Sequence, residues 1–289
     1  MGYGEVEVSG TVGVSLPSRY WIGVEGTVRD RFWVFCCPAN SDYGSLGRRS
    51  VMTPAEAAFY LDVPNVIVVQ SGEPESRYGR FEPPFAQYAI ALRPFRRLAW
   101  SVVGSCGFTS ESETKEVLDL ARSTPNIIAL MLDDFFTGRN EEPRARLGLE
   151  DLRRIRHEAT SGGKRLDLFV TYYYRRFLGL DLNDYLEMID VVTLWAREEE
   201  IGDLEETLSS VERAMPGKRI MLGCYMFEYT HRRPTPIALM EMQCETGLRW
   251  LRDGRIEGMI FLGNTVADFD FPSVEWTRRW IRNVGDRRL

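Results

Sequence analysis

The chain has 289 residues, of which 44% are hydrophobic and 27% charged, and its formal net charge is -6 with a pI near 5.3. This length and composition are typical of a globular protein with a large core. The negative charge disfavours nucleic acid as a partner, because a phosphate backbone requires a basic face. No apolar run approaches the ~18 residues of a membrane span, so we also expect no membrane partner.

The five cysteines are odd in number and mostly lie within apolar runs, which predicts buried, reduced thiols rather than a disulfide framework. His157 and His231 are the only histidines, and no CxxC pair occurs. We therefore expect no cofactor and no histidine-ligated zinc or iron site. The N-terminus lacks the basic and apolar segments of a signal peptide, which predicts a cytoplasmic protein.

Residues 5–14 alternate apolar and polar side chains, as in a half-exposed strand. We interpret residues 1–28 as an N-terminal β extension and residues 29–289 as one domain.

From residue 31 onward, short apolar runs alternate with segments that have helical periodicity. Thr53 and Pro54, for example, are typical of the first turn of a helix. Eight strand–helix units in ~250 residues predict a (β/α)8 TIM barrel of the α/β class rather than an open sheet. The expected strands are 31–38, 65–71, 98–105, 126–136, 166–174, 189–195, 219–227 and 256–263.

The fourth expected strand is almost wholly apolar until it reaches Asp133 and Asp134. In this fold the carboxyl ends of the strands form the active face. Side chains on a strand alternate in direction, so we expect only one of the two acids to face the barrel mouth and the other to cap a helix or pair with an arginine.

Further polar and aromatic residues follow the other strands. Glu228 follows strand seven, across the barrel axis from strand four, although Arg232 or Arg233 offers it a simple salt bridge. Phe136, Tyr173, Trp195 and Tyr229 offer aromatic faces to a sugar ring. We predict Asp134, Asp133 and Glu228 as catalytic residues, and Glu73, Asn40, Tyr173, Trp195, Arg197, Tyr225 and Asn264 as substrate-binding residues.

Glycoside cleavage requires two carboxyl groups flanking the scissile bond. Acids after strands four and seven of such a barrel resemble the TIM-barrel glycoside hydrolase superfamily, which places its acid/base on strand four and its second carboxylate on strand seven. The chain has Leu132-Asp133-Asp134-Phe135 where the largest clan of that superfamily has Asn-Glu. The Asp pair is also similar to barrels that use an Asp on strand four as nucleophile. The resemblance implies hydrolysis of a carbohydrate substrate.

Two other functions are compatible with the same residues. Asp133, Asp134, Glu73 and Glu228 are oxygen ligands suited to Mg²⁺ or Mn²⁺ in a lyase, aldolase or isomerase. A non-catalytic barrel that binds a glycan would have ion-paired acids and an open aromatic groove. A Schiff-base aldolase is excluded, because Lys115, Lys164 and Lys218 all lie away from the strand ends. The oligomeric state is left open.

Overall fold

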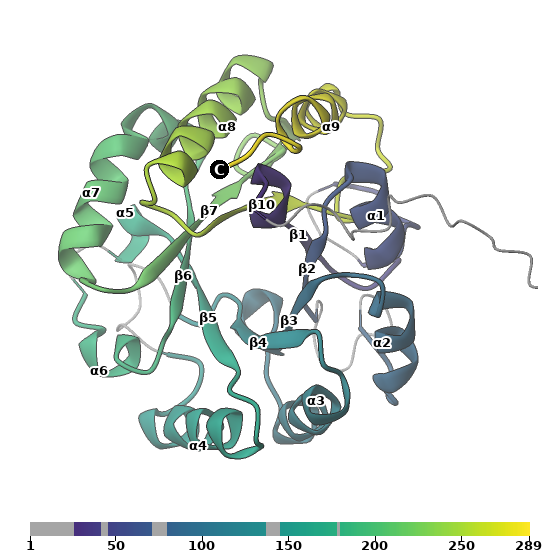
Figure 1. Ribbon diagram of the computed structural model, residues 1–289, viewed down its shortest axis with the longest axis vertical. Coiled ribbons are helices and arrows are strands. Elements are labelled where there is room, and N and C mark those ends of the chain that lie inside the picture. Colours follow the sequence, from purple (N-terminus) through teal and green to yellow (C-terminus); the bar gives the residue numbers. More distant parts are fainter. Residues whose placement is uncertain (1–25, 42–45, 71–79, 137–144, 178–179) are drawn as a thin grey trace, which may run out of the picture.

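Eight parallel strands close on themselves to form the centre of this computed structural model, which describes residues 26–41, 46–70, 80–136, 145–177 and 180–289 (Figure 1). The strand β1 pairs with both β2 and β10, so the barrel has no free edge. The prediction of a single (β/α)8 TIM barrel is confirmed. The barrel strands are β1 Phe32–Cys36, β2 Asn65–Val68, β3 Arg97–Val103, β4 Ile127–Leu132, β5 Asp167–Tyr172, β6 Val191–Trp195, β7 Arg219–Cys224 and β10 Gly258–Leu262.

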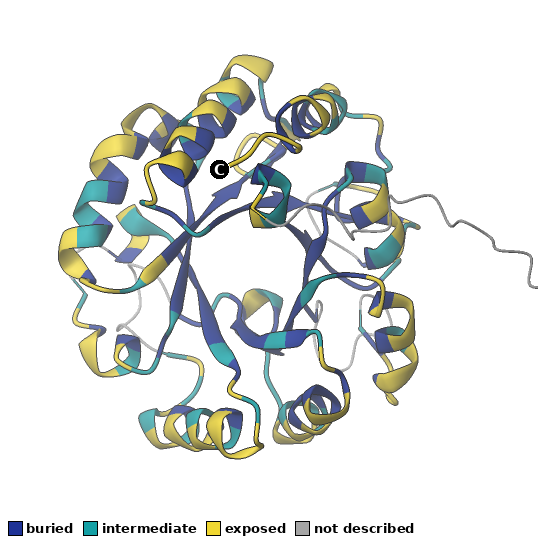
Figure 2. Ribbon diagram, viewed as in Figure 1, coloured by how far each residue is buried: buried dark blue, intermediate teal, exposed yellow. Residues whose placement is uncertain are grey.

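Helices surround the barrel and turn their apolar sides inward, so that the strands form a buried ring and the outer helix faces are exposed (Figure 2). None of the described helices is both long and apolar enough to cross a membrane. The helices are α1 Pro54–Leu61, α2 Ala86–Leu92, α3 Glu111–Ser123, α4 Leu149–Ser161, α5 Tyr174–Phe177, α6 Asn183–Leu186, α7 Leu204–Ala214, α8 Ile237–Arg252 and α9 Pro272–Val284, with the 3-10 turns η1 Val28–Arg31, η2 Ser105–Gly107 and η3 Glu198–Asp203.

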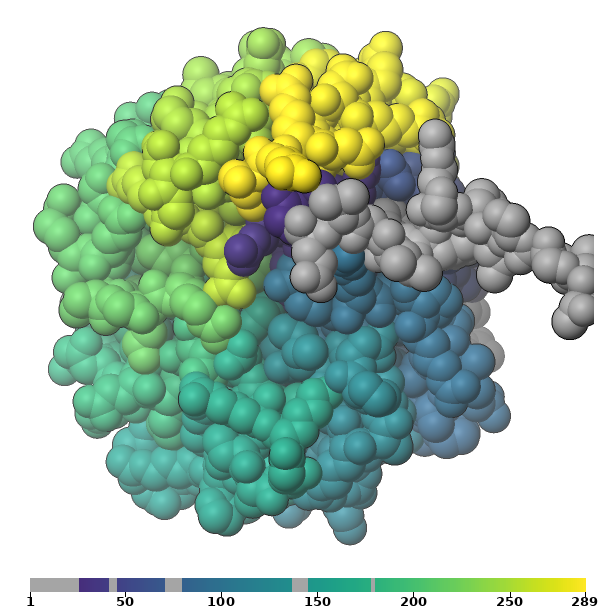
Figure 3. Space-filling view, viewed as in Figure 1, coloured from purple at the N-terminus to yellow at the C-terminus, as the bar shows by residue number. Residues whose placement is uncertain are grey.

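Local sequence accounts for several of these boundaries. Thr53 and Glu56 form a capping box, in which the Thr53 hydroxyl accepts from the Glu56 amide and the Glu56 carboxylate accepts from the Thr53 amide (2.8 Å). Ser110 caps α3 in the same way by accepting from the Glu113 amide (3.2 Å). The chain ends beside its first described residues, where Thr27 bridges Arg288, and Figure 3 shows the C-terminal residues packed against the start of the barrel.

The structure departs from the sequence prediction in several details, and each barrel strand is shorter than its predicted range. The fourth strand ends at Leu132 instead of continuing to residue 136. The fifth helix is divided into the short helices α5 and α6. A two-stranded hairpin, β8 Phe227–Glu228 and β9 Arg233–Pro234, follows β7 and was not expected. The predicted β extension, residues 1–28, lies almost wholly outside the described residues.

Aromatic side chains from opposite strands fill the barrel. Trp33 meets Phe169 with ring centroids 5.8 Å apart, and Phe35 meets Trp195 at 5.9 Å. The Trp195 indole lies directly against the backbone of Gly223, where an added Cβ would come within 2.1 Å of the ring. Only glycine leaves room for this ring, which supports the mouth of the barrel from below.

Gly223→Ala is therefore expected to lower the free energy of unfolding by about 1–3 kcal/mol, the usual cost of overpacking a core. Chemical denaturation measures this loss, and a changed tryptophan emission of the native state would report the displaced indole. Gly202→Ala is the matched control, because its added Cβ meets no atom within 4 Å. Equal stabilities of the two variants would contradict the packing argument.

Candidate active site

Asp133 and Asp134 both approach the same side of β5. The Thr171 hydroxyl donates to Oδ1 of Asp133 (2.7 Å), and the Tyr173 hydroxyl donates to Oδ1 of Asp134 (3.0 Å). Thr171 and Tyr173 are two residues apart, as are side chains on one side of a strand. The expectation that only one acid faces the mouth is wrong, because β4 ends at Leu132 and Asp134 has a left-handed backbone with φ of 43°. That conformation is uncommon for a residue other than glycine and is concentrated at functional sites.

Asp133 is a buried carboxyl that favours its neutral form. Its residue is only 4% exposed. Burial, with the negative charge of Asp134 adding to it, raises the pKa of Asp133 from 3.8 to about 8, against the opposing hydrogen bond from Thr171. At neutral pH this group therefore holds a proton.

Asp134 is the more accessible of the two acids, being half-buried. Its carboxylate accepts a hydrogen bond from the Cys106 amide (3.0 Å) through Oδ2, in addition to the bond from Tyr173. The Cys106 amide points at Asp134 because η2 contains a left-handed residue at this position, with φ of 61°. Two donors, the Cys106 amide of η2 and the Tyr173 hydroxyl after β5, thus hold the Asp134 carboxylate in one orientation.

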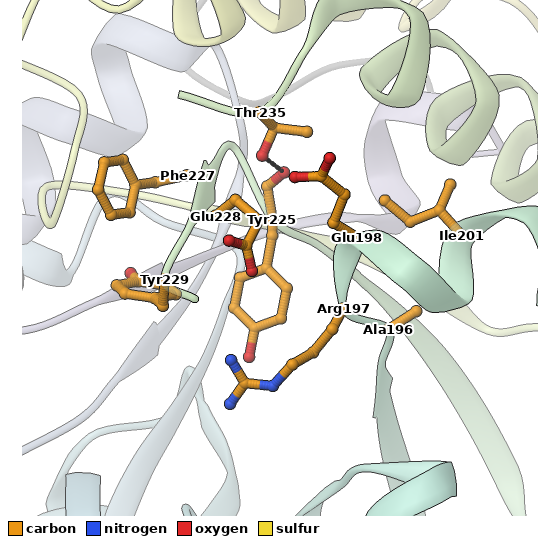
Figure 4. A pocket seen from close by; sticks show the side chains of 9 residues that line it. All are labelled: Ala196, Arg197, Glu198, Ile201, Tyr225, Phe227, Glu228, Tyr229 and Thr235. Carbon is orange, nitrogen blue, oxygen red and sulfur yellow. Dashed lines mark hydrogen bonds between the residues drawn. The ribbon is translucent and has the colours of Figure 1, made fainter. Parts of the chain in front are cut away.

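Aromatic side chains from three neighbouring strands form one wall of the mouth. Tyr225 lies 4.8 Å from Trp195 and 5.6 Å from Tyr229 between ring centroids, and its hydroxyl is within hydrogen-bonding reach of Tyr173. Burial raises the pKa of Tyr173 and Tyr225 well above the ordinary value. Both hydroxyls therefore remain protonated, so that Tyr173 acts as a donor to Asp134. Figure 4 shows Tyr225 and Tyr229 with Arg197 at this wall.

Phe136 does not belong to this wall. Its side chain is buried and packs against Phe135, Phe177 and Tyr185 in the layer between barrel and helices.

Glu228 is held by its own hairpin. Glu228 is 5% exposed. Its Oε1 accepts from the Thr230 amide (3.0 Å), and its Oε2 accepts from the His231 amide. Nδ1 of His231 also lies 3.0 Å from Oε2. Burial alone would raise the pKa of Glu228, but the hydrogen bonds from His231 and Thr230 lower it. The salt bridge expected with Arg233 goes instead to Glu198 (2.5 Å). Glu228 is thus held as a carboxylate, and its catalytic role stays a prediction.

The remaining predicted residues differ in their surroundings. Asn264 is buried, and all of its side-chain amide is hydrogen-bonded to the backbone. Its oxygen accepts from the Cys37 amide (2.9 Å), and its nitrogen donates to the carbonyls of Cys37 (2.7 Å) and Met52 (2.8 Å). Asn40 is an exposed left-handed turn residue with φ of 63°. Glu73 lies outside the described residues. These positions leave their predicted substrate contacts as predictions.

The donor set bears on metal and cofactor chemistry. Within the described ranges, the one group of three potential ligand residues is Glu198, Glu228 and His231, and none includes the Asp133–Asp134 pair. Lys164 and Lys218 bind backbone carbonyls, those of Ile127 (2.5 Å) and Ile189 (2.8 Å) respectively, just before or at the start of strands β4 and β6. Lys115 is an exposed residue of α3, so none of the three lysines lies at the C-terminal end of a barrel strand, as expected from the sequence.

Sequence reasoning missed Thr171 and the Cys106 amide as partners of the two acids. The position of Thr171 was predictable, since it lies two residues before Tyr173 in an expected strand and its side chain therefore points to the same side. The Cys106 amide had none, because its direction depends on the left-handed turn of η2.

Comparison with known proteins gives the fold alone. No protein-family model matches this chain, and no curated protein does. A solved structure of a candidate α-L-fucosidase from Bacteroides thetaiotaomicron is similar with a TM-score of 0.53 and 9% identity, over 81% of this chain and 88% of that one. Tryptophan synthase from Pyrococcus furiosus matches with a TM-score of 0.48 and 10% identity over 88% and 97% of the two chains. A 2,3-dimethylmalate lyase matches at 0.47 and 11% over 89% and 83%. At 9% identity, the match with a TM-score of 0.53 supports the TIM-barrel fold and nothing beyond it.

Proposed function

We propose that this TIM barrel is a glycoside hydrolase in which Asp134 is the carboxylate that acts at the anomeric carbon and Asp133 is the proton-bearing group beside it. One observation carries the proposal: two neighbouring carboxyl groups follow the C-terminal end of β4, and burial raises the pKa of Asp133 to about 8 while donors orient Asp134. Neighbouring acids in unlike environments supply the two roles that glycoside cleavage needs.

The roles follow from the surroundings of each group. Asp133 is neutral near pH 7 and is suited to protonate the departing glycosidic oxygen as the C–O bond breaks. Asp134 is suited to attack the anomeric carbon or to accept a proton from an attacking water. Glu228, held as a carboxylate by two backbone amides, fits a charge-stabilising role better than that of a proton donor.

The environment of the acids supports catalysis rather than binding alone. Neither Asp133 nor Asp134 forms an ion pair with a described arginine or lysine, so their charge is not neutralised by a structural partner. Tyr173, Tyr225 and Tyr229 are only partly buried near the acids, and their rings are suited to pack against a sugar, while the buried Trp195 supports Tyr225 from below.

A lyase, aldolase or isomerase is the second candidate, favoured by a protonated Asp133 that lies next to the Asp134–Tyr173 pair. Such a set can move a proton next to a carbonyl group. The Mg²⁺- or Mn²⁺-dependent form would need a third oxygen ligand from outside the described residues, for which Glu73 is the predicted source.

A substrate panel separates the two candidates. Purified protein is incubated with 4-nitrophenyl glycosides of neutral and acidic sugars, and with 2-keto and 2-hydroxy acids in D₂O, each with and without Mg²⁺. We expect release of 4-nitrophenol that does not depend on Mg²⁺, with the product anomer assigned by NMR. Deuterium incorporation or C–C cleavage without any glycoside turnover would move the assignment to the second candidate.

A further inference from the structure

Arg197 directs a positive charge into the mouth beside the proposed catalytic acids. Its backbone is fixed at the start of η3, where its amide donates to Oε2 of Glu200 (2.7 Å). In Figure 4 its side chain extends along Tyr225 toward the hydroxyl end of that ring. The guanidinium carbon lies 5.9 Å from the ring centroid of Tyr173, the residue that donates to Asp134.

The charge of Arg197 has no acidic partner among the described residues. Toward the described residues, its guanidinium donates one hydrogen bond, to the Thr230 hydroxyl at a long 3.4 Å. The acids of the same rim are engaged elsewhere: Glu198 pairs with Arg233 (2.5 Å), and Glu228 binds backbone amides of its hairpin.

A second guanidinium lies near the same tyrosine. The Arg176 guanidinium carbon is 5.8 Å from the Tyr173 ring centroid, its side chain is exposed, and no carboxylate of the described part of the chain pairs with it. Tyr173 is therefore contacted by Asp134 at its hydroxyl and by two cations around its ring. In a chain of net charge -6, two guanidinium groups thus lie around one ring without an ion pair to a described acid.

We propose that the substrate of this barrel is the glycoside of an acidic sugar, whose carboxylate is bound by Arg197. This inference rests on the proposed glycosidase function and names its substrate class. A planar carboxylate matches the two parallel donors of a guanidinium, and charge-assisted bonds of this kind are strong and selective. The anion and the reacting carbon would then lie on either side of Tyr173, with Arg197 holding the sugar and Asp134 reaching the anomeric carbon. Arg176 adds a weaker attraction from the rim.

The test measures binding separately from turnover. Isothermal titration calorimetry compares glucuronate and galacturonate with glucose and galactose, on the wild type and on Arg197→Gln, Arg197→Lys and Arg176→Gln. We expect Arg197→Gln to weaken binding of the acidic sugar on the order of 10- to 100-fold, the range for a lost hydrogen bond to a charged group, and to weaken binding of neutral sugars much less. Arg197→Lys should restore part of the affinity, and Arg176→Gln should have the smaller effect.

Arg249→Gln is the matched control, because this exposed arginine of α8 pairs with Glu205 (3.4 Å) on the outer surface and removes the same unit of charge. Equal affinity of wild type and Arg197→Gln for the acidic sugars, or no binding of acidic sugars at all, would overturn the inference.

Steady-state kinetics separates a failure of the acidic-sugar inference from a failure of the proposed glycosidase function. The ratio of kcat/KM for a 4-nitrophenyl glucuronide over the matching glucoside should fall with Arg197→Gln. Cleavage of neutral glycosides with an unchanged ratio would overturn the acidic-sugar inference and leave the glycosidase assignment standing. Arg197-dependent binding of a uronate without cleavage of any glycoside would support the anion site and overturn the glycosidase assignment.

Discussion

Asp134→Asn is expected to lower kcat/KM for the hydrolysed glycoside by about 10³-fold or more with little change in stability, since removal of a nucleophile or base has effects of this size. The asparagine oxygen can still accept from the Tyr173 hydroxyl, whereas the amide nitrogen that replaces Oδ2 cannot accept from the Cys106 amide. The loss of that one bond costs about 1 kcal/mol. What is lost is the negative charge and nucleophilicity of the carboxylate. Steady-state kinetics on the best substrate of the panel, with thermal unfolding of the same sample, measures both quantities.

Asp119→Asn is the matched control for that substitution. Asp119 is an exposed residue of α3 that pairs with Arg122 on the same helix, so its loss removes one carboxylate far from the mouth. Activity within about tenfold of the wild type in Asp134→Asn would show that this carboxylate does not act at the reacting carbon.

The second large effect concerns stability. Asp133→Asn is expected to raise the free energy of unfolding relative to the wild type, and the difference should grow as the pH rises from about 4 to about 8. The pKa of Asp133 is 3.8 in the unfolded chain and about 8 in the folded protein, so between these values the folded state binds more protons than the unfolded state. The contribution of Asp133 to the free energy of unfolding of the wild type is therefore fully present below pH 4, and it is lost as the pH rises toward 8. Each pKa unit corresponds to about 1.4 kcal/mol, which places the expected difference at several kcal/mol.

Chemical denaturation of both proteins at a series of pH values checks this expectation. Asp134→Asn provides an internal comparison. Without the negative charge of Asp134, the pKa of Asp133 in the folded protein should be lower, so the pH-dependent loss of stability should be complete at a lower pH than in the wild type. A constant difference between wild type and Asp133→Asn across pH 4–8 would contradict a buried, protonated Asp133.

The fold was predictable because its determinants are local. The six apolar residues from 127 to 132, and their counterparts along the chain, predict strands buried on both faces. Capping residues such as Thr53 mark where a helix begins. Eight such units can pack in few ways, and in the closed barrel every strand is hydrogen-bonded to a neighbour on both sides. The hairpin β8–β9 was missed because two residues per strand carry no periodic pattern.

The sequence by itself determined that this protein is a (β/α)8 barrel with acids and aromatic residues after its fourth to seventh strands, since strand and helix patterns depend on neighbours along the chain. Only the tertiary structure decided that Asp133 and Asp134 both approach β5, that Glu228 is occupied by its hairpin, and that Arg197 has no described acidic partner. The physical reason is that burial, hydrogen-bond partners and charge neighbours come from residues distant in sequence. The charge state and orientation of a side chain follow from those neighbours and not from its own position.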